Sequence, residues 1–472
     1  MFCYPWTNLH ELNLGWAMHK LKELPDDGDC VFVRPEEFPE SENPVADAVQ
    51  KAADDAKMVL LSGVYDVTET IYVPEGMTII GTNNARLVSA QKNVTGFCPT
   101  TIFEMGPSTT VKNVTFDGNR PDGASLSITP SDLNPGETFE RAPLVLLNDV
   151  AVVTFEGCIF TNYDSNRMAA DSWQNAVIGA YQAYRINLKD CIMFNCRREG
   201  ITFVNSGIIT IDNFYFSMQN DPGDVYTEIG LLNTDDVNIT NCWLIKADGV
   251  TTSAINAQGS RINIKGCFVH APNSNYGIDY GNEIAADFSA RDLLISECYL
   301  NCHISAATTY PVDHNNVKII NNTLDATDVT GSSGLIMVYG TNDNVFDIIN
   351  NHFTGNFVSP VLHGIRTGQN MSIKISIVGN TFEAGAIRVS EDIPPMLIAN
   401  NWFKDDAIYQ ATANATAQTL VFNGCTCTRV GRFGALGAGN EITVILVGCD
   451  FRRSVCTNAF AVDASLSYIR GV

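Results

Sequence analysis

Apolar and polar residues alternate in short runs that recur along most of the chain. Each copy reads apolar, any, apolar, any, then Asn, Gly, Asp or Glu, then a small or polar residue, any, and apolar again, as in Val237–Leu244 and Ile262–Val269. Alternation with a period of two predicts a β-strand on each side of the fifth position. Asn or Gly at that position favours a tight bend with a left-handed backbone. We call the fifth position the anchor, and the fourteen anchors are Gly81, Asn113, Gly157, Asp190, Asn213, Asn241, Gly266, Glu297, Asn321, Asn350, Gly379, Asn400, Gly424 and Gly448.

The anchors are unequally spaced, and this irregularity identifies the kind of repeat. Loops of different length can be inserted at one corner of a stacked turn while its strands stay in register. A third short apolar run lies between copies, at 144–147, 177–181, 201–203, 229–232 and 335–338. The pattern therefore predicts an all-β chain, a single right-handed parallel β-helix of about fourteen turns with three strands per turn. Ile239, Ile264, Ile295 and Ile319 occupy the same repeat position and should stack inside it.

The residue after the anchor predicts ladders of identical side chains. It is Cys in seven copies and Asn in four consecutive copies, Asn322, Asn351, Asn380 and Asn401. Stacked turns place such residues about 4.8 Å apart, where Asn amides can hydrogen-bond along the stack. Cysteines stacked in register rarely have the side-chain twist of a disulfide, so we expect free thiols.

The sequence predicts three segments, and the first two of them contain helices. Residues 1–25 have an apolar stripe at helical spacing, containing Leu14, Met18 and Leu21, and Asn8 with Glu11 can form a capping box. Residues 26–59 form a linker and a capping helix, in which Asn43 is the N-cap and Pro44 the first helical residue. Residues 60–472 form the β-helix.

Two resemblances to known families extend this interpretation. The stretch from the capping helix through Gly63-Val-Tyr65 to Tyr72–Gly81 resembles the opening of the pectate-lyase-like β-helix superfamily. That superfamily contains lyases, hydrolases and inactive binders, so the resemblance implies a fold more than an activity. Residues 4–24 resemble the N-terminal element of bacteriophage tail-spike and fibre proteins. This second resemblance implies a virion protein made in the host cytoplasm, attached to phage tail or neck proteins through residues 1–25, and a homotrimer.

Composition narrows the partners and cofactors. The formal net charge is −23, which disfavours nucleic acid and an anionic membrane surface as partners. The first residues do not read as a secretory signal, and no apolar run is long enough to insert into a membrane. The fourteen cysteines are spread along a long chain, and no Cys-x-x-Cys pair recurs at the spacing of a zinc site. We therefore expect no bound metal. No cofactor motif occurs, and we expect none.

Acidic residues near three predicted loops are the candidates for catalysis. The long intervals place loops 117–142, 161–175 and 270–290 at one corner, where they can wall a groove. Glu199 and Glu228 each precede a predicted first strand, so we expect them on adjacent turns. Glycoside hydrolysis generally uses two carboxylates roughly 5 to 9.5 Å apart. The five carboxylates named as candidate acid, base or nucleophile are Glu199, Asp224, Glu228, Asp235 and Asp236.

Aromatic residues in the same region are candidates for sugar binding. Aromatic rings can stack on sugars, and an exposed ring beside Asn and Asp is typical of a polysaccharide groove. Ordinary packing of the loops is the alternative for each ring. The candidates are Tyr163, Trp173, Tyr226, Tyr276 and Tyr280.

Three functions fit these observations. The first is a phage tail spike or appendage that binds and depolymerises a host surface polysaccharide. The second is a virion spike of the same fold that serves receptor binding or architecture without catalysis. The third is a cellular polysaccharide lyase or hydrolase, which is disfavoured because such an enzyme must reach an extracellular polymer.

Overall fold

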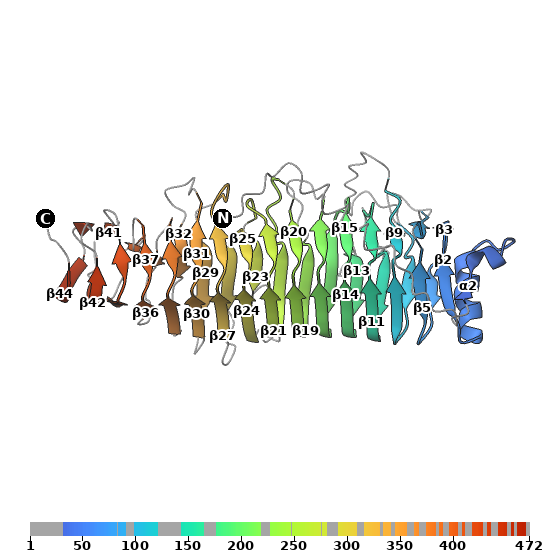
Figure 1. The fold of residues 1–472 in the computed structure, drawn as a ribbon, viewed down its shortest axis with the longest axis horizontal. Coiled ribbons are helices and arrows are strands. Elements are labelled where there is room, and N and C mark those ends of the chain that lie inside the picture. The colour runs from blue at the N-terminus through green and yellow to red at the C-terminus, as the bar shows by residue number, and fades with distance from the viewer. Residues whose placement is uncertain are drawn as a thin grey trace, which may run out of the picture. The chain divides into compact units, whose positions relative to one another are not determined.

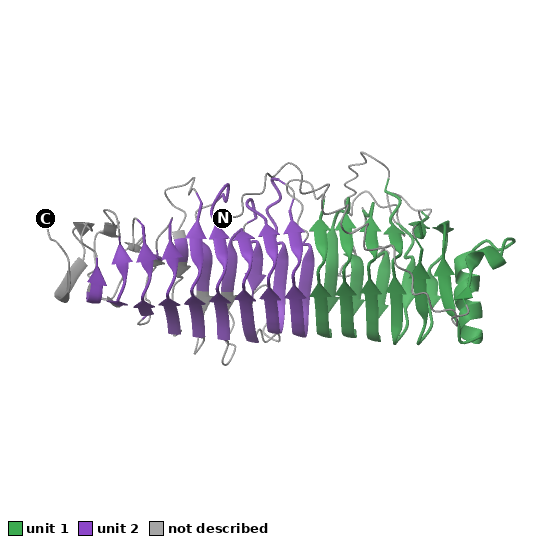
Figure 2. Ribbon diagram, in the orientation of Figure 1, with its two compact units in different colours: residues 1–219 green, residues 220–472 purple. Residues whose placement is uncertain are grey.

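A computed structural model describes most of the chain after residue 31. The described residues are 32–82, 84–90, 99–120, 143–164, 176–218, 227–246, 248–274, 276–280, 291–308, 316–330, 334–340, 345–355, 363–367, 374–383, 387–389, 396–404, 408–410, 418–427, 432–435, 442–450, 455–456 and 460–468. The predicted N-terminal helix at 1–25 lies outside them. The chain divides into two compact units, 1–219 and 220–472, which Figure 2 shows in green and purple. Each unit, considered by itself, is a right-handed parallel β-helix, as the sequence pattern predicts.

Unit 1 contains three rows of parallel strands, one row for each strand of the turn (Figure 1). First strands are β4 (Ile71–Val73), β7 (Phe103–Met105), β10 (Val145–Asn148), β13 (Ala176–Tyr181) and β16 (Glu199–Val204). Second strands are β1 (Phe32–Val33), β2 (Met58–Leu61), β5 (Thr78–Gly81), β8 (Thr109–Lys112), β11 (Ala151–Glu156), β14 (Tyr184–Lys189) and β17 (Gly207–Asp212). Third strands are β3 (Val64–Val67), β6 (Arg86–Ser89), β9 (Thr115–Asp117), β12 (Ile159–Thr161), β15 (Ile192–Phe194) and β18 (Tyr215–Ser217).

Unit 2 repeats the same three rows, and its first two turns merge the first and second strands into β19 (Ile229–Thr240) and β21 (Ile255–Lys265). The other first strands are β23 (Ile278–Tyr280), β26 (Ile304–Thr308), β29 (Gly334–Gly340), β32 (His363–Thr367), β35 (Ile387–Val389), β38 (Ile408–Gln410), β41 (Arg432–Ala435) and β43 (Val455–Cys456). Second strands are β24 (Arg291–Ser296), β27 (Asn316–Ile320), β30 (Val345–Ile349), β33 (Lys374–Val378), β36 (Met396–Ala399), β39 (Gln418–Asn423), β42 (Ile442–Asp450) and β44 (Phe460–Tyr468). Third strands are β20 (Trp243–Ile245), β22 (Phe268–His270), β25 (Tyr299–Asn301), β28 (Thr323–Asp325), β31 (His352–Thr354), β34 (Thr381–Phe382), β37 (Trp402–Phe403) and β40 (Thr426–Cys427).

The anchor corner has the left-handed backbone that the sequence predicts. Every anchor from Asn113 to Gly448 has a φ between 51 and 68°. Gly81, the first anchor, is the exception and is glycine for another reason. A Cβ at Gly81 would lie 2.2 Å from the carbonyl oxygen of Asn113 on the next turn, so the position excludes any side chain.

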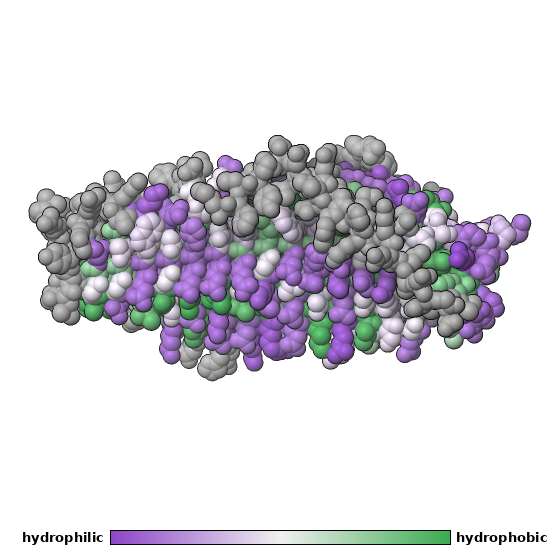
Figure 3. Space-filling view, in the orientation of Figure 1, coloured by the Kyte–Doolittle hydropathy of each residue, from purple (hydrophilic) through white to green (hydrophobic). Residues whose placement is uncertain are grey.

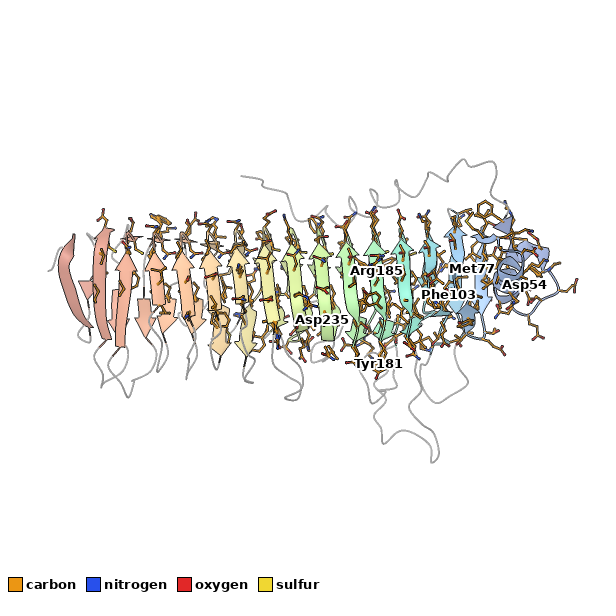
Figure 4. All side chains as sticks on the ribbon, turned by 90° about the horizontal axis from the view of Figure 1, so that it is seen from below. Asp54, Met77, Phe103, Tyr181, Arg185 and Asp235 are labelled. Carbon is orange, nitrogen blue, oxygen red and sulfur yellow. The ribbon has the colours of Figure 1, made fainter. Side chains whose placement is uncertain are left out.

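The predicted isoleucine stack forms the core of unit 2. Strand register pairs Ile239 with Ile264, Ile264 with Ile295 and Ile295 with Ile319, and all four are at most 1% exposed. Side chains recur in such rows from turn to turn within each unit (Figure 4). Most side chains on the face drawn in Figure 3 are hydrophilic wherever the structure describes them. Apolar residues therefore point inward and polar ones outward, as a period of two requires.

The asparagine ladder is also confirmed. Asn351 Oδ1 accepts hydrogen bonds from the backbone N–H and the Nδ2 of Asn322, both at 3.0 Å. Asn351 Nδ2 donates to the carbonyl of Ile319 at 2.7 Å and to Oδ1 of Asn380 at 3.1 Å. Asn380 bonds to Asn401 in the same way. Each amide in the ladder thus satisfies buried backbone groups on neighbouring turns, which would otherwise be unpaired.

The cysteine positions form buried, reduced ladders. The ten cysteines whose side chains the structure describes are all free thiols and all buried. Cys267 N donates to Cys298 Sγ at 3.4 Å, and Cys425 N donates to Cys449 Sγ at the same distance. A thiol therefore replaces the Asn amide as acceptor on these turns, as a small and weakly polar side chain can.

A helix, α2 (Pro44–Asp54), lies beside β2 at the start of unit 1 (Figure 1). Asn43 Oδ1 accepts from the backbone N–H of Ala46 at 3.2 Å, so the predicted N-cap is confirmed. Val45, Ala48 and Val49 are buried against the first turn. The helix covers apolar core that the end of a solenoid would otherwise expose. Among the described residues, no helix is long and apolar enough to cross a membrane.

The loops follow the prediction in unit 1 and depart from it in unit 2. In unit 1 the corners between first and second strands are short: residues 74–77 and 106–108, and then two residues each at 149–150, 182–183 and 205–206. Residues 118–144 and 162–175, in contrast, connect third strands to first strands. The predicted loop 270–290 is wrong, because β23 interrupts it and pairs with β21 and β26. From Tyr280 onward, long connections also follow first strands, at 281–290, 309–315 and 341–344. Long connections are therefore confined to one corner in unit 1, whereas in unit 2 they occur at two corners.

We expect Asn351→Ala to destabilise the protein by about 1–3 kcal/mol, because it leaves the buried N–H of Asn322 and carbonyl of Ile319 unpaired. Thermal unfolding should show a clearly lower Tm. Asn238→Ala is the matched control, since Asn238 is exposed and its Oδ1 accepts a hydrogen bond from Nδ2 of the half-buried Asn263 instead of from buried backbone groups. Equal melting temperatures for the two variants would contradict the ladder's role.

Candidate functional site

The structure describes seven of the ten candidate residues. Trp173, Asp224 and Tyr226 lie outside the described part of the chain. Glu199 belongs to unit 1, and Glu228, Asp235 and Asp236 belong to unit 2. Pairing of Glu199 with Glu228 as acid and base therefore stays a prediction.

Glu228 forms a fully buried ion pair. It precedes β19, its side chain is 0% exposed, and its Oε2 lies 2.8 Å from Nζ of Lys246, which is 1% exposed. Lys246 Nζ also donates to the carbonyl of Ser253 at 3.0 Å. Within the part of the chain that the structure describes, Glu228 Oε1 has no hydrogen-bond partner. Burial raises the pKa of Glu228, and the nearby Lys246 ammonium offsets this only in part.

Asp235 and Asp236 lie at the other end of the first strand. Asp236 follows the corner at Asn233, and Arg261 Nε contacts its Oδ1 at 2.5 Å. This hydrogen bond holds the pKa of Asp236 below its usual range. Glu228 and Asn233 are five residue steps apart along an extended chain, a separation of about 16 Å between their Cα atoms. Neither aspartate is therefore close enough to act with Glu228, since the two carboxylates of a glycosidase lie within about 9.5 Å.

Glu199 is the first residue of β16 rather than the residue before it, and its register partner is Ala176. Its side chain is 8% exposed, so it borders solvent while most of it is buried. Arg198, immediately before it, has a left-handed backbone with φ of 75°. An arginine in this conformation is uncommon, and such positions cluster at functional sites.

The described aromatic candidates do not form a sugar platform. Tyr163 and Tyr280 have no exposed surface, so neither ring can stack on a ligand. Tyr280 ends β23, and its side chain packs in the core rather than in a loop. Tyr276 is half-buried, and it is the one described aromatic candidate that keeps exposed surface.

A group of charged residues that the sequence interpretation missed lies at the corner where third strands end in unit 1. We call Arg120, Asp164, Arg197 and Arg198 the arginine cluster. Asp164 Oδ1 lies 3.1 Å from Arg198 Nε, and its Oδ2 lies 3.6 Å from Arg197 Nη1 and 3.9 Å from Arg120 Nε. The four side chains are between 3% and 13% exposed. Three guanidinium groups thus converge on one carboxylate at the rim of unit 1.

A signal for this cluster was present in the sequence. Arg120, Asp164 and Arg197 each follow their anchors, Asn113, Gly157 and Asp190, by the same offset on three consecutive turns. Aligning the residues after the third strand would have shown a cation, an anion and a cation in one column. Carboxylates alone do not mark this column, because Asp164 is the single acidic residue of the three.

Metal binding has no support among the described residues, where no three His, Cys, Asp or Glu side chains gather as ligands. Cys158 and Cys191 are buried on neighbouring turns and hydrogen-bond to backbone carbonyls, including Val111 and Phe155. Burial raises the pKa of Cys196 to about 12, which keeps it a thiol and a poor ligand.

No protein-family model matches the chain, and no curated protein sequence matches it. Several solved structures are similar in fold. The catalytic domain of a GH87 alpha-1,3-glucanase in complex with tetrasaccharides is 14% identical with a TM-score of 0.44, over 93% of this chain and 69% of that one. The mannuronan C-5 epimerase AlgE6 A-module of Azotobacter vinelandii is 11% identical with a TM-score of 0.44, over 90% and 100%. Tailspike protein 3 of bacteriophage CBA120 is 12% identical with a TM-score of 0.35, over 93% and 61%.

The raised pKa of Glu228 predicts a pH dependence of stability. A carboxyl whose folded pKa exceeds its unfolded value, about 4.3, stabilises the fold below that value and loses this contribution as pH rises. Wild type should therefore lose stability relative to Glu228→Gln between about pH 4 and neutrality, measured by denaturant unfolding. Glu297→Gln, an exposed carboxylate beside Lys265, is the control. If the unfolding free energy of wild type instead rises relative to that of Glu228→Gln as pH rises, the ion pair with Lys246 outweighs the cost of burial, which would contradict the prediction.

Proposed function

We propose that this protein is an appendage protein that binds a cell-surface polysaccharide through the corner of unit 1 where third strands end. One observation carries the proposal. The first-to-second corner in unit 1 keeps the same short length from β10 to β17, while the third-to-first corner carries the connections 118–144 and 162–175 and the arginine cluster. Variable connections on a rigid scaffold are where binding sites are usually built.

Polar chemistry at this corner suits a sugar polymer. Asn162 Nδ2 donates to both carboxylate oxygens of Asp117 at 3.2 Å. Asn195, one turn further along the chain, donates from its Nδ2 to Oδ1 of Asn162. Arg86 contacts Asp117 from the turn below. Amides, carboxylates and guanidiniums that follow one line across turns supply donors and acceptors at about 4.8 Å intervals, which suits an extended polymer with many hydroxyls.

Depolymerisation is the second candidate, and the buried Glu228 favours it. A general acid needs a raised pKa, and burial raises that of Glu228. Its side chain is 0% exposed and bonded to Lys246, however, so a substrate could reach it only after the pair opens. Binding without hydrolysis is therefore the function that the geometry supports best.

The finer assignment follows from the sequence resemblance. We propose that the protein is a phage tail spike or appendage, located on the virion, with residues 1–25 attached to tail or neck proteins. A homotrimer of parallel rods is the assembly we propose, because a threefold arrangement closes symmetrically.

Assays of binding and of product release on one panel of purified host capsular and cell-wall polysaccharides distinguish the two candidate functions. We expect wild type to bind at least one polymer by affinity electrophoresis and to release no reducing ends or unsaturated products. If products do appear, turnover should be lost in Glu199→Gln or Glu228→Gln while binding is retained. Turnover that persists in both variants would remove these two carboxylates from the mechanism, and wild type that binds no polymer would contradict the proposal.

Deleting residues 1–25 should abolish incorporation into the particle and leave the fold intact. The apolar stripe of Leu14, Met18 and Leu21 is the expected docking face. Circular dichroism melting checks the fold, and sedimentation with purified particles checks incorporation. A truncated chain that unfolds would show that the segment is a cap, which would contradict the docking role.

A further inference from the structure

We propose that copies of this chain associate through the outer face of the second strands of unit 2, on six consecutive turns from β27 to β42. Eight apolar residues point outward there, and we call them the outer apolar face: Ile320, Ile349, Val378, Leu397, Ala399, Val421, Ile445 and Val447. This inference rests on the proposed assembly of several copies and names the surface through which they meet. It does not depend on glycan binding.

Strand register places these side chains in two columns. In the column directly before the anchors, Ile320 pairs with Ile349, Ile349 with Val378, and Val378 with Ala399. The second column, two residues earlier on each strand, is apolar on the last three of the six turns: Leu397, Val421 and Ile445. The two columns therefore run side by side along the outside of the unit.

The second strands of these turns are apolar on both faces. Ile319, Ile348 and Ile377 fill the core and are at most 1% exposed, while the apolar residue after each of them points outward. A strand covered on both faces reads as a continuous apolar run, whereas a strand with one face in water alternates. Leu397 is 50% exposed, and Figure 3 shows several apolar side chains over the second strands toward the C-terminal end of unit 2. This pattern indicates a face that a partner covers.

The solenoid itself does not require apolar residues at these positions. In unit 1 the column before the anchors is charged on four consecutive turns, which carry the register partners Lys112, Glu156, Lys189 and Asp212. Lys112 Nζ lies 2.9 Å from Glu156 Oε2, so opposite charges pair along that column. The same kind of strand thus carries a solvated face in unit 1 and an apolar face in unit 2, where an exposed apolar patch marks an interaction site.

The chemistry and spacing of the face select another copy of the chain as its partner. None of the eight side chains is aromatic, so the face offers no ring for a sugar, and none is a hydrogen-bond donor or acceptor. Its side chains form ridges at intervals of about 4.8 Å. A surface with the same interval fits such ridges over their whole length, and a second copy aligned in parallel has that interval on every turn.

Charge also favours association at this face. The chain carries a net charge of −23, so most surfaces of two copies repel each other. On the six turns, the column before the anchors contains no charged residue, and the other column contains one of each sign, Lys318 and Asp347. The face is therefore locally neutral, and apolar contact between copies meets little repulsion there.

The size of the face fits a reversible contact. Six turns about 4.8 Å apart, with strands of about five residues, give a flat area of roughly 480 Å² per copy and roughly 960 Å² for two copies. Specific interfaces bury at least about 1,000 Å² in total, and side chains that stand out from the sheet add to the flat value. We therefore expect association that depends on protein concentration.

Sedimentation equilibrium of the full chain over a range of concentrations tests the inference, and wild type should self-associate. Ile349→Lys combined with Val378→Glu puts opposite charges on register partners and leaves the net charge unchanged. Lys112 and Glu156 show that such a pair is compatible with the fold. We expect the double variant to associate about tenfold or more weakly, because contact between copies would remove both charges from water.

A matched control and a second measurement accompany this variant. Thr154→Lys combined with Asn187→Glu makes the same change at half-buried, outward register partners of unit 1, and it should leave association unchanged. Ser376→Cys, two residues before Val378 in the second column, should give covalent dimers with a short bis-maleimide linker. Thr210→Cys, at the equivalent position in unit 1, should not. These conservative replacements do not depend on how the charged variants fold.

The outcomes separate this inference from the proposed function. A wild type that stays monomeric at every concentration would overturn the inference and the proposed homotrimer, while glycan binding would still stand. Association of wild-type strength in the double variant, or an equal loss in its control, would overturn the inference alone. Cross-linking at Thr210→Cys in place of Ser376→Cys would likewise assign the contact to another surface.

Discussion

The in-register hydrogen bonding of successive turns is the constraint on which the rest of the structure depends. Every anchor from Asn113 to Gly448 has a left-handed backbone, so the chain turns at the same repeat position in each of these turns. A residue then meets its counterpart on the next turn about 4.8 Å away, whatever happens in the connections. The isoleucine stack, the asparagine ladder and the thiol ladders are consequences of that single rule. The same rule aligns Arg120, Asp164 and Arg197 at the rim of unit 1.

The repeat made the core of the fold predictable from sequence. Alternation around Asn and Gly identified the strands, and the stacking of Ile239, Ile264, Ile295 and Ile319 follows from their common position. Asn351 and its neighbours could be predicted as a ladder because a buried amide needs a partner at the repeat distance. The anchor position at Gly81 was predicted correctly, but the reason for glycine there is different. Glycine is needed because the backbone of Asn113 approaches closely, and not because the chain makes a left-handed turn.

Corners and sites were less predictable because their contacts do not repeat. β23 is a strand of three residues inside a polar stretch, and only pairing with β21 and β26 identifies it. Whether an acidic residue is solvated, like Asp235, or sealed in an ion pair, like Glu228, depends on the distant residue that meets it. Lys246 is eighteen residues from Glu228 in sequence, so no local pattern links them. Tyr163 and Tyr280 likewise looked like exposed loop rings and are buried by packing against other turns.

The arrangement separates a rigid, apolar scaffold from a polar rim in unit 1, and the central claim is that this rim binds a glycan. Amide hydrogen exchange of the full chain, with and without the tightest-binding oligosaccharide, tests it most directly. The account predicts slowed exchange at 118–120, 162–164 and 195–199, and unchanged exchange at the buried ladder amides of Asn351 and Asn380. Protection confined to unit 2, or none at the three rim segments under saturating ligand, would contradict it.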